Sequence, residues 1–556
     1  MVISRRALLR SAAAFSGAGA VAAASHSVAF AQAGPAFHHG VASGDPLPDR
    51  VVLWTRITPS SDALPGSGIG GAVSVRWEVS RDAAFTSLAA RGTVTTGPER
   101  DHTVKIDAGG LEPDTTYFYR FAGLGDAAQA TSPVGATRTA PAFSADVSRL
   151  RFGVVSCSNW EAGYFAAYRH LADRGDIDAI IHLGDYLYEY GAGEYGGKEG
   201  SLRFHEPAHD IVSLADYRIR HGQYKTDPDL QRLHASVPWI PIWDDHESAN
   251  DAWRNGAENH DPASQGPWGM RYRSALQAYL EWMPVRPGGT GDRLYRRLQF
   301  GDLCELSMID LRSYRDEPAA AGTGWPAVDA TERTITGADQ MSWLVTGMTT
   351  AAARWRLIGN PVMIAPLVVP PLEPATTEAL TQMLGLPRGG IPINTDQWDG
   401  YTADRRRIID AIATTGTANV VFLTGDIHST WASELPMNPA NYPAAGTAAV
   451  EFVVPSVTSK NIDDILGVPE RSVSPAAEEA IRQVNRHVRY VELDSHGYGV
   501  CEVTPGHVQM DWFFVGNLAD PATGARHALS YRTRDGSPTI EPAAVLDPAA
   551  HRPGRS

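Results

Sequence analysis

The chain has 556 residues, of which 43% are hydrophobic and 20% charged, as in a typical globular protein. This length is too great for one ordinary hydrophobic core, so we expect two domains. The formal net charge of −15 argues against nucleic acid or a strongly anionic membrane as the general partner, because both favour basic surfaces.

The N-terminus has the pattern of an export signal. Arg5 and Arg6 precede a weakly apolar run rich in alanine and glycine, which ends in Ala31-Gln32-Ala33. Paired arginines, a mildly apolar segment and a small-residue cleavage site are typical of twin-arginine signal peptides. We therefore predict that residues 1–33 are removed and that the protein is secreted, to the periplasm or the extracellular space. This route exports folded proteins, so a cofactor could be bound before secretion.

Residues 34–140 are predicted to form a small all-β sandwich of the fibronectin or immunoglobulin type. Apolar and polar residues alternate here in short runs separated by Gly, Pro and Asp. The segment 111–117 (LEPDTTY) resembles a tyrosine corner, in which the hydroxyl of Tyr117 would pin the chain where it crosses between sheets. No catalytic grouping occurs here, so this domain is expected to act as a brace or a surface module.

Beyond a linker at 140–147, helical and strand patterns alternate, which predicts an α/β catalytic domain over residues 148–530 and a C-terminal tail over 531–556. Long irregular stretches follow two of the predicted strands. We expect these stretches, 190–225 and 254–267, to form walls of the active-site cleft.

Four predicted buried strands each run into residues of the kind that bind metals. The strands are 151–156, 179–183, 237–243 and 418–423, and the residues that follow them include Cys157, Asp185, Asp245, His246, Asp426 and His428. A single Asp or His at the end of one strand is usually a cap or a turn residue. Because open α/β folds bind ligands at the carboxyl ends of their strands, four in the same context predict a metal site.

Cys157 is the candidate ligand among three cysteines. It lies among polar residues, whereas Cys304 and Cys501 lie in apolar alternating stretches and are interpreted as buried thiols. An odd number of cysteines in an exported chain leaves at least one thiol free.

The donor types separate into two unequal positions. Asp185 can bridge two cations because a carboxylate has two oxygens. One position would combine its carboxylate with a thiolate, a phenolate and an imidazole, which favours iron(III) or zinc; these donors are Cys157, Tyr188 and His428. The other would have oxygen donors only, from Asp185, Asp245 and Asp426, which favours calcium, magnesium or manganese. Two adjacent cations of this kind suit hydrolysis of phosphate esters by an activated water.

These strand-end residues resemble the motifs of the calcineurin-like metallophosphoesterases, DxH, GDxx, GNH[DE], H and GHxH. Three segments match, namely 184–185, 244–247 and 425–428, while Cys157, Asn159, Asp245 and Asp426 depart from the common pattern. This substituted set is similar to the PhoD-type alkaline phosphatase and phosphodiesterase family. The segment 37–59 also resembles the start of that family's N-terminal sandwich, and the resemblance covers nearly all of the mature chain.

The resemblance implies a metallophosphoesterase β-sandwich core flanked by helices, with iron(III) at the first metal position and calcium at the second. It also implies that His246 contacts the phosphoryl group or helps to protonate the leaving oxygen. The alternative role for His246 is to orient Asp245.

Other residues are weaker candidates. Asn159 would contact the substrate, or it would only stabilise the turn in which it lies. Asn360 stands where relatives outside this branch have a metal-binding histidine, so it would donate a carbonyl oxygen or serve a turn. Arg312 and Arg271 are candidate phosphate clamps, with ion-pair or surface roles as the alternative.

We therefore expect a secreted, monomeric phosphoesterase that hydrolyses mono- and diesters with metal-activated water. Because the same scaffold includes metal-dependent, non-HKD phospholipase D enzymes, release of a phospholipid head group is the alternative. The apolar segment 365–372 would then touch a membrane surface transiently, or it is a buried crossover. A calcium-dependent secreted binding protein stays open as another class. The oxygen-only second position and the order of the motifs argue against a redox iron protein that uses Cys157 and Tyr188.

Overall fold

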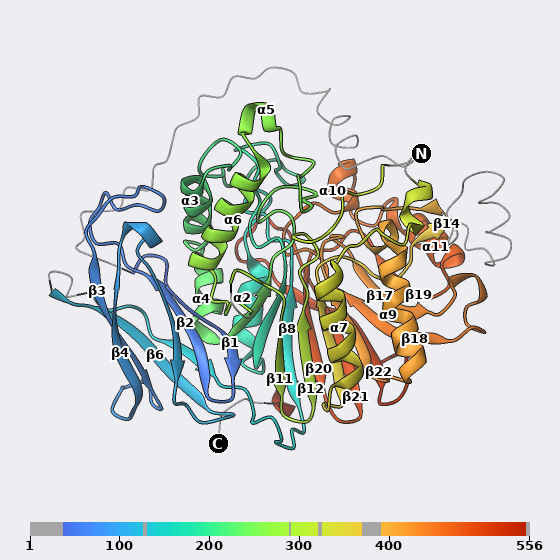
Figure 1. The fold of residues 1–556 in the computed structure, drawn as a ribbon, viewed down its shortest axis with the longest axis horizontal. Helices are drawn as coiled ribbons and strands as arrows, with labels where there is room; N and C mark the ends of the chain where they lie inside the picture. Colours follow the sequence, from blue (N-terminus) through green and yellow to red (C-terminus); the bar gives the residue numbers. More distant parts are fainter. Residues whose placement is uncertain (1–36, 126–129, 289–290, 321–324, 370–390, 552–556) are drawn as a thin grey trace.

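Figure 1 shows the computed structural model of the chain, which describes residues 37–551 except for 126–129, 289–290, 321–324 and 370–390. The predicted signal peptide lies outside this part of the chain. Among the described residues, no helix is both long enough and apolar enough to cross a membrane.

Two large sheets form the centre of the molecule (Figure 1). The ten-stranded sheet contains, in spatial order, β23 (Ile540–Pro542), β22 (Ala525–Arg534), β21 (His507–Val515), β20 (Gly497–Val503), β8 (Leu150–Val155), β9 (Ala179–Leu183), β10 (Trp239–Ile242), β1 (Val41–Leu47), β2 (Arg50–Arg56) and β5 (Thr103–Gly109). The seven-stranded sheet contains β11 (Arg296–Phe300), β12 (Cys304–Met308), β13 (Trp355–Asn360), β16 (Val420–Thr424), β18 (Thr447–Val453), β17 (Thr430–Pro436) and β19 (Val488–Glu492). Their apolar faces share one core, which confirms the predicted sandwich of sheets.

Helices cover the outer faces of both sheets. One group packs on the ten-stranded sheet: α2 (Ala166–Arg174), α3 (Leu214–Tyr224), α4 (Pro228–Ser236) and α6 (Trp268–Trp282). The seven-stranded sheet is covered by α7 (Ala338–Thr350) and α9 (Thr402–Thr415), whose apolar residues pack against β13 and β16. Shorter elements complete the fold: α5 (Pro262–Gln265), α10 (Ile462–Leu466), α11 (Ser474–Val484) and the hairpin of β14 (Val368–Val369) with β15 (Ile391–Pro392).

The N-terminal β domain is present, with its own apolar core. Its second sheet contains β4 (Leu88–Thr96), β3 (Val73–Ser80), β6 (Thr116–Gly123) and β7 (Gly135–Arg138). The Tyr117 hydroxyl oxygen accepts a hydrogen bond from the Glu112 backbone N–H at 2.9 Å, the contact expected of the tyrosine corner. The other sheet is continuous with the catalytic one, because β1 pairs in parallel with β10 at Gly44 and Trp239.

The C-terminal residues are also part of the large sheet. Residues 531–551, expected as a tail, continue β22 and add β23 at the sheet edge. Tyr531 pairs with Pro542 and Thr533 with Ile540 across these two strands. The compact domain therefore extends past residue 530.

Candidate metal centre

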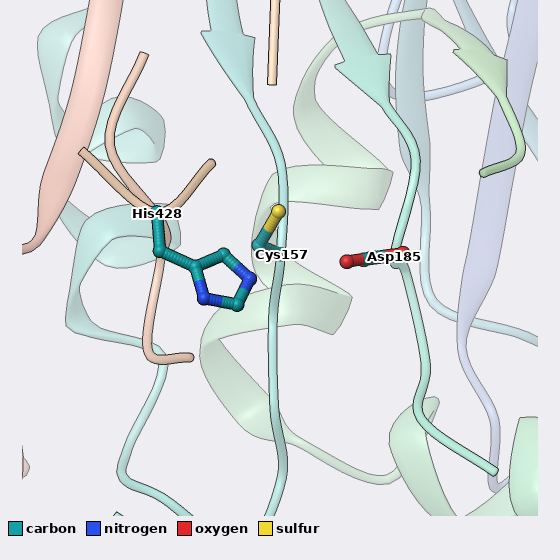
Figure 2. Close-up of side chains that lie close together, drawn as sticks. All are labelled: Cys157, Asp185 and His428. Atoms are coloured by element: carbon teal, nitrogen blue, oxygen red, sulfur yellow. The ribbon is translucent and has the colours of Figure 1, made fainter. Parts of the chain in front are cut away.

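The carboxyl ends of β8, β9, β10 and β16 meet at one place, although β16 belongs to the opposite sheet. Figure 2 shows Cys157, Asp185 and His428 turned toward a common point, and their ligand atoms lie within 4.8 Å of one another. Two further groups with ligand atoms within 4.8 Å of one another are Asp185, Asp245 and His246, and Asp244, Asp245 and Asp426. Asp185 therefore connects the Cys157 side of the centre with the carboxylate side.

The backbone at these strand ends is strained. Four of the converging residues have positive φ angles: Cys157 (60°), Asp185 (55°), Asp426 (63°) and His428 (54°). Non-glycine residues rarely adopt this left-handed conformation, and such strain concentrates at functional sites. Gly184, with φ of 103°, gives β9 its sharp exit, since a Cβ there would collide with the backbone of Asp244.

Glu247 holds the two neighbouring strand ends together. Its carboxylate accepts hydrogen bonds from the backbone N–H groups of Asp185 (3.1 Å), Tyr186 (2.7 Å) and Asp244 (2.9 Å). Burial raises the pKa of Glu247 to about 7, while these N–H groups act in the opposite direction by favouring the carboxylate. The acidic residue that ends the third motif therefore orients the chain around the site.

Tyr188 joins the Cys157 side of the centre. Its hydroxyl donates to Oδ2 of Asp185 at 2.9 Å and lies 3.3 Å from Nε2 of His428. The His428 Nδ1–H donates to the carbonyl oxygen of Lys460 at 2.7 Å, which leaves Nε2 facing the centre. Ser459 donates to the Tyr188 oxygen at 2.5 Å.

These donors fit a resident cation. Oδ1 of Asp185 is buried and has no hydrogen-bond partner among the described residues. Burial raises the pKa values of Asp185 and Cys157 well above their usual values, because their charged forms have lost solvent. A bound cation reverses this effect and stabilises the carboxylate and the thiolate. Thiolate, phenolate, imidazole and carboxylate together fit iron(III) or zinc.

Arg312 occupies the carboxylate side of the centre and is buried. It donates to Oδ2 of Asp244 at 2.8 Å and to Oδ2 of Asp396 at 2.9 Å. Its Nη2 also lies 3.6 Å from Oδ1 of Asp245 and 3.5 Å from Oδ1 of Asp426. Of the two roles considered for Arg312, this geometry supports the ion-pair role.

Two residues beside the carboxylates were not expected from the sequence. Asp244 belongs to a recognised motif, but only the structure shows that it lies within the carboxylate group. Gln397 donates to Oδ2 of Asp426 at 2.8 Å. Gln397 has no sequence signal for this role, because the contact depends on how residues 391–400 fold over the site.

His246 is held by a carboxylate on its outer side. Its Nδ1 lies 2.7 Å from Oε2 of Glu189, and both side chains are buried. Burial alone would lower the pKa of His246, but the charges of Asp245, Asp185 and Glu189 outweigh it and raise this pKa well above its usual value. The Glu189 carboxylate favours the protonated imidazole, which is the form that a general acid needs.

Comparison with known proteins places this chain in a family. The model of the PhoD-like phosphatase family matches residues 152–512, and that of its N-terminal domain matches residues 21–141. The chain belongs to the PhoD-like phosphatase family. It is 36% identical over 504 residues to alkaline phosphatase D of Bacillus subtilis (strain 168), covering 89% of this chain and 80% of that protein. A solved PhoD structure superposes with a TM-score of 0.80 at 34% identity and covers 92% of each chain.

The side chain of Asn159 links loop segments through hydrogen bonds. Its amide donates to the Tyr195 carbonyl at 2.6 Å, and its side-chain oxygen accepts from the Glu161 N–H at 3.0 Å. Both ends of the side chain are therefore engaged, which favours the turn role. Arg271 is similarly engaged away from the centre, donating to the Asn259 carbonyl at 2.6 Å.

The side chain of Asn360 is also held by hydrogen bonds within the protein. Its side-chain oxygen accepts from the indole N–H of Trp398 at 3.0 Å, and its amide donates to the Val362 carbonyl at 2.6 Å. These contacts favour the turn role over metal binding for Asn360.

The segment 365–372 is mostly buried where it is described. Ala365, Leu367 and Val368 are buried, Val369 is 43% exposed, and residues 370–372 lie outside the described part of the chain. The Ala365 N–H is bonded to Glu451 at 2.8 Å. The described residues thus fit a crossover, with Val369 as the exposed position.

Proposed function

We propose that the protein hydrolyses phosphate mono- and diesters with a water molecule activated by two cations. One observation carries this proposal: buried ligand atoms of Cys157, Asp185 and His428 lie within 4.8 Å of one another, beside a group of carboxylates, in a PhoD-like phosphatase. Phosphoesterase activity agrees with the name of the Bacillus relative, an alkaline phosphatase.

Iron(III) is proposed for the Cys157 side, and calcium for the carboxylate side. Cys157, Asp185, Tyr188 and His428 would hold the first, and Asp185, Asp245 and Asp426 the second; zinc, magnesium or manganese are the alternatives. When bound, such cations supply a hydroxide near neutral pH and neutralise charge on the phosphoryl oxygens.

His246 is proposed as the group that protonates the leaving oxygen or contacts the phosphoryl group. Glu189 binds Nδ1, so Nε2 is the nitrogen that can face a reacting atom. Arg312 forms ion pairs with Asp244 and Asp396 beside these donors, and its charge opposes the rise in the pKa of Asp244 that burial causes.

The test is the metal content of a cysteine variant. Cys157→Ala should lose iron and most phosphoesterase activity, together with any visible absorption band from thiolate or tyrosinate charge transfer. Cys501→Ala is the matched control, because Cys501 is another buried free thiol, on β20 away from the site. Full iron occupancy in Cys157→Ala would refute the ligand assignment.

Head-group release from phospholipids is a second candidate. Val369 at the end of β14 (43%) and Ile393 directly after β15 (40%) are exposed, and the chain continues from there to Asp396 and Gln397, which contact the site. Two apolar side chains so placed could touch a lipid surface. Hydrolysis of phosphatidylcholine should be compared with that of a phosphomonoester and a nitrophenyl diester. Choline release far above the other two rates supports this candidate, and no release removes it.

Secretion through the twin-arginine route is proposed from the N-terminal sequence, and we also propose that the secreted protein is a monomer. Replacing Arg5 and Arg6 by lysine should leave uncleaved protein inside the cell. Cleavage and export at the normal rate would contradict the proposal. Light scattering of the secreted protein tests the monomeric state.

A further inference from the structure

Basic residues line a groove between the N-terminal sandwich and α6. It has a volume of about 460 Å³ and is formed by β5 and the residues before it on one side and by α6 on the other. Its basic members are Arg100, Lys105 and Arg273. This concentration stands out in a chain whose net charge is −15.

The two arginines have no counterion among the described residues. Neither Arg100 nor Arg273 forms an ion pair or a side-chain hydrogen bond with any residue in the part of the chain that the structure describes. Both are exposed at the groove, with their guanidinium groups free to bind an anion. An arginine guanidinium offers a planar set of N–H donors that matches phosphate oxygens.

Lys105 adds a third cation from the sandwich side. Its ammonium group donates one hydrogen bond to the carbonyl of Leu280, which leaves two further N–H donors. Burial lowers the pKa of Lys105 to about 8; Asp45 and Glu281 oppose this effect, and Arg100 and Arg296 reinforce it. An anion bound in the groove would relieve the repulsion between these cations.

The acidic residues at the groove do not cancel this charge. Both oxygens of Glu281 are occupied by Arg218, at 2.8 Å each, and one also accepts from Gln277 at 2.9 Å. Asp292 is the remaining acidic member of the groove. Three basic side chains therefore face one carboxylate, that of Asp292, which forms no ion pair within the described part of the chain.

We propose that this groove is a binding site for a phosphate group, separate from the metal centre. The group could be free inorganic phosphate or the phosphate of an anionic lipid head group, because both present the same oxygens to Arg100, Lys105 and Arg273. This assignment does not depend on the proposed catalytic function. Binding by such an open cluster should weaken as ionic strength rises.

The test compares two double variants of the full metal-loaded chain. Arg100→Ala with Arg273→Ala removes the groove arginines, and Arg91→Ala with Arg486→Ala removes two exposed arginines elsewhere, so the change in net charge is the same. Binding of radiolabelled inorganic phosphate is measured by equilibrium dialysis, and binding to vesicles by cosedimentation, with phosphatidylglycerol present or absent. Turnover of a small soluble ester checks that the metal centre is intact in both.

The groove variant should bind one phosphate fewer per chain than the wild type, or bind anionic vesicles at least tenfold more weakly, while the control variant does neither. Loss of phosphate binding alone identifies the free ion as the ligand, and loss of vesicle binding identifies the head group. Equal phosphate and vesicle binding by the groove variant and the control would overturn the proposal.

Discussion

Nδ1 of His246 lies 2.7 Å from Oε2 of Glu189, so the proposed general acid is fixed by a buried carboxylate. Glu189 is itself held in place, because its other oxygen accepts from the Asn250 N–H at 2.7 Å and from the Asn259 amide at 2.9 Å. A carboxylate bound to Nδ1 fixes the tautomer and stabilises the protonated ring. Glu189 is therefore a positioning residue that acts through His246.

Glu189→Gln should reduce turnover most for esters with poor leaving groups. Hydrogen bonds to charged groups contribute about 1.5–3 kcal/mol, so we expect roughly a ten- to hundredfold loss with an alkyl phosphate and a smaller loss with nitrophenyl phosphate, whose leaving group needs no proton. The kcat ratio of the two substrates is the measurement. Glu258→Gln, which removes a carboxylate bonded to Asn250, is the control. An equal loss on both substrates would show that Glu189 has only a structural role.

The sequence predicted the positions of the strand ends well. The strand expected at 179–183 is β9 with the same limits, and those around it differ by a few residues. Local patterns suffice here, because an unbroken apolar run followed by Gly184 and Asp185 identifies a buried strand and its exit. The residues that follow the strands therefore converge as the motif order suggested.

Long-range partners were not predictable in this way. The segment 41–47 was not among the predicted strands, and nothing in its sequence shows that β1 would pair with β10 and join the two domains into one sheet. Likewise, Glu189 is an unremarkable acidic residue until the fold brings His246 to it. Such contacts depend on residues distant in sequence, which periodicity does not report.

Tyr188→Phe should weaken iron binding while leaving the fold intact. The change removes a phenolate donor, together with its hydrogen bonds to Asp185 and Ser459, and keeps the ring. Metal analysis should show iron loss during dialysis against a mild chelator, and any tyrosinate absorption band should disappear. Tyr195→Phe is the control, because Tyr195 stacks on Tyr188 with ring centroids 5.5 Å apart but is not a proposed ligand. An unchanged band and iron content in Tyr188→Phe would exclude Tyr188 as a ligand.

Arg312→Gln should destabilise the protein strongly, and calcium should offset part of the loss. Removing one partner from a buried ion pair typically costs about 3–5 kcal/mol, since the carboxylate of Asp244 stays buried without its counterion, whereas Asp396 keeps its ion pair with Arg315. Urea unfolding with calcium and with a chelator measures both effects. Arg354→Gln breaks an exposed pair with Asp535 and should lose less than about 1 kcal/mol. Similar losses in both variants would contradict the buried role.

Lys225→Met should stabilise the protein at pH 6 and much less at pH 9. Burial lowers the pKa of Lys225 to about 7 in the folded chain, whereas an unfolded lysine has a pKa of about 10.4. Between these values the unfolded chain binds more protons, so the free energy of unfolding of the wild type rises with pH, and below about pH 7 the full penalty applies. The shift corresponds to a few kcal/mol, on the order of 1.4 kcal/mol per pKa unit.

The substitution to methionine leaves no polar group stranded. The Tyr186 hydroxyl and Nε2 of His234, which both contact the Lys225 ammonium group, are also bonded to each other at 2.9 Å. Unfolding free energies of both proteins at pH 6 and pH 9, at constant ionic strength, give the comparison. Lys198→Met is the control, and it should destabilise the protein instead of stabilising it. The ion pair of Lys198 with Asp463 raises the pKa of Lys198 despite partial burial. If Lys225→Met raises the unfolding free energy equally at the two pH values, the pKa of Lys225 is not lowered in the folded protein.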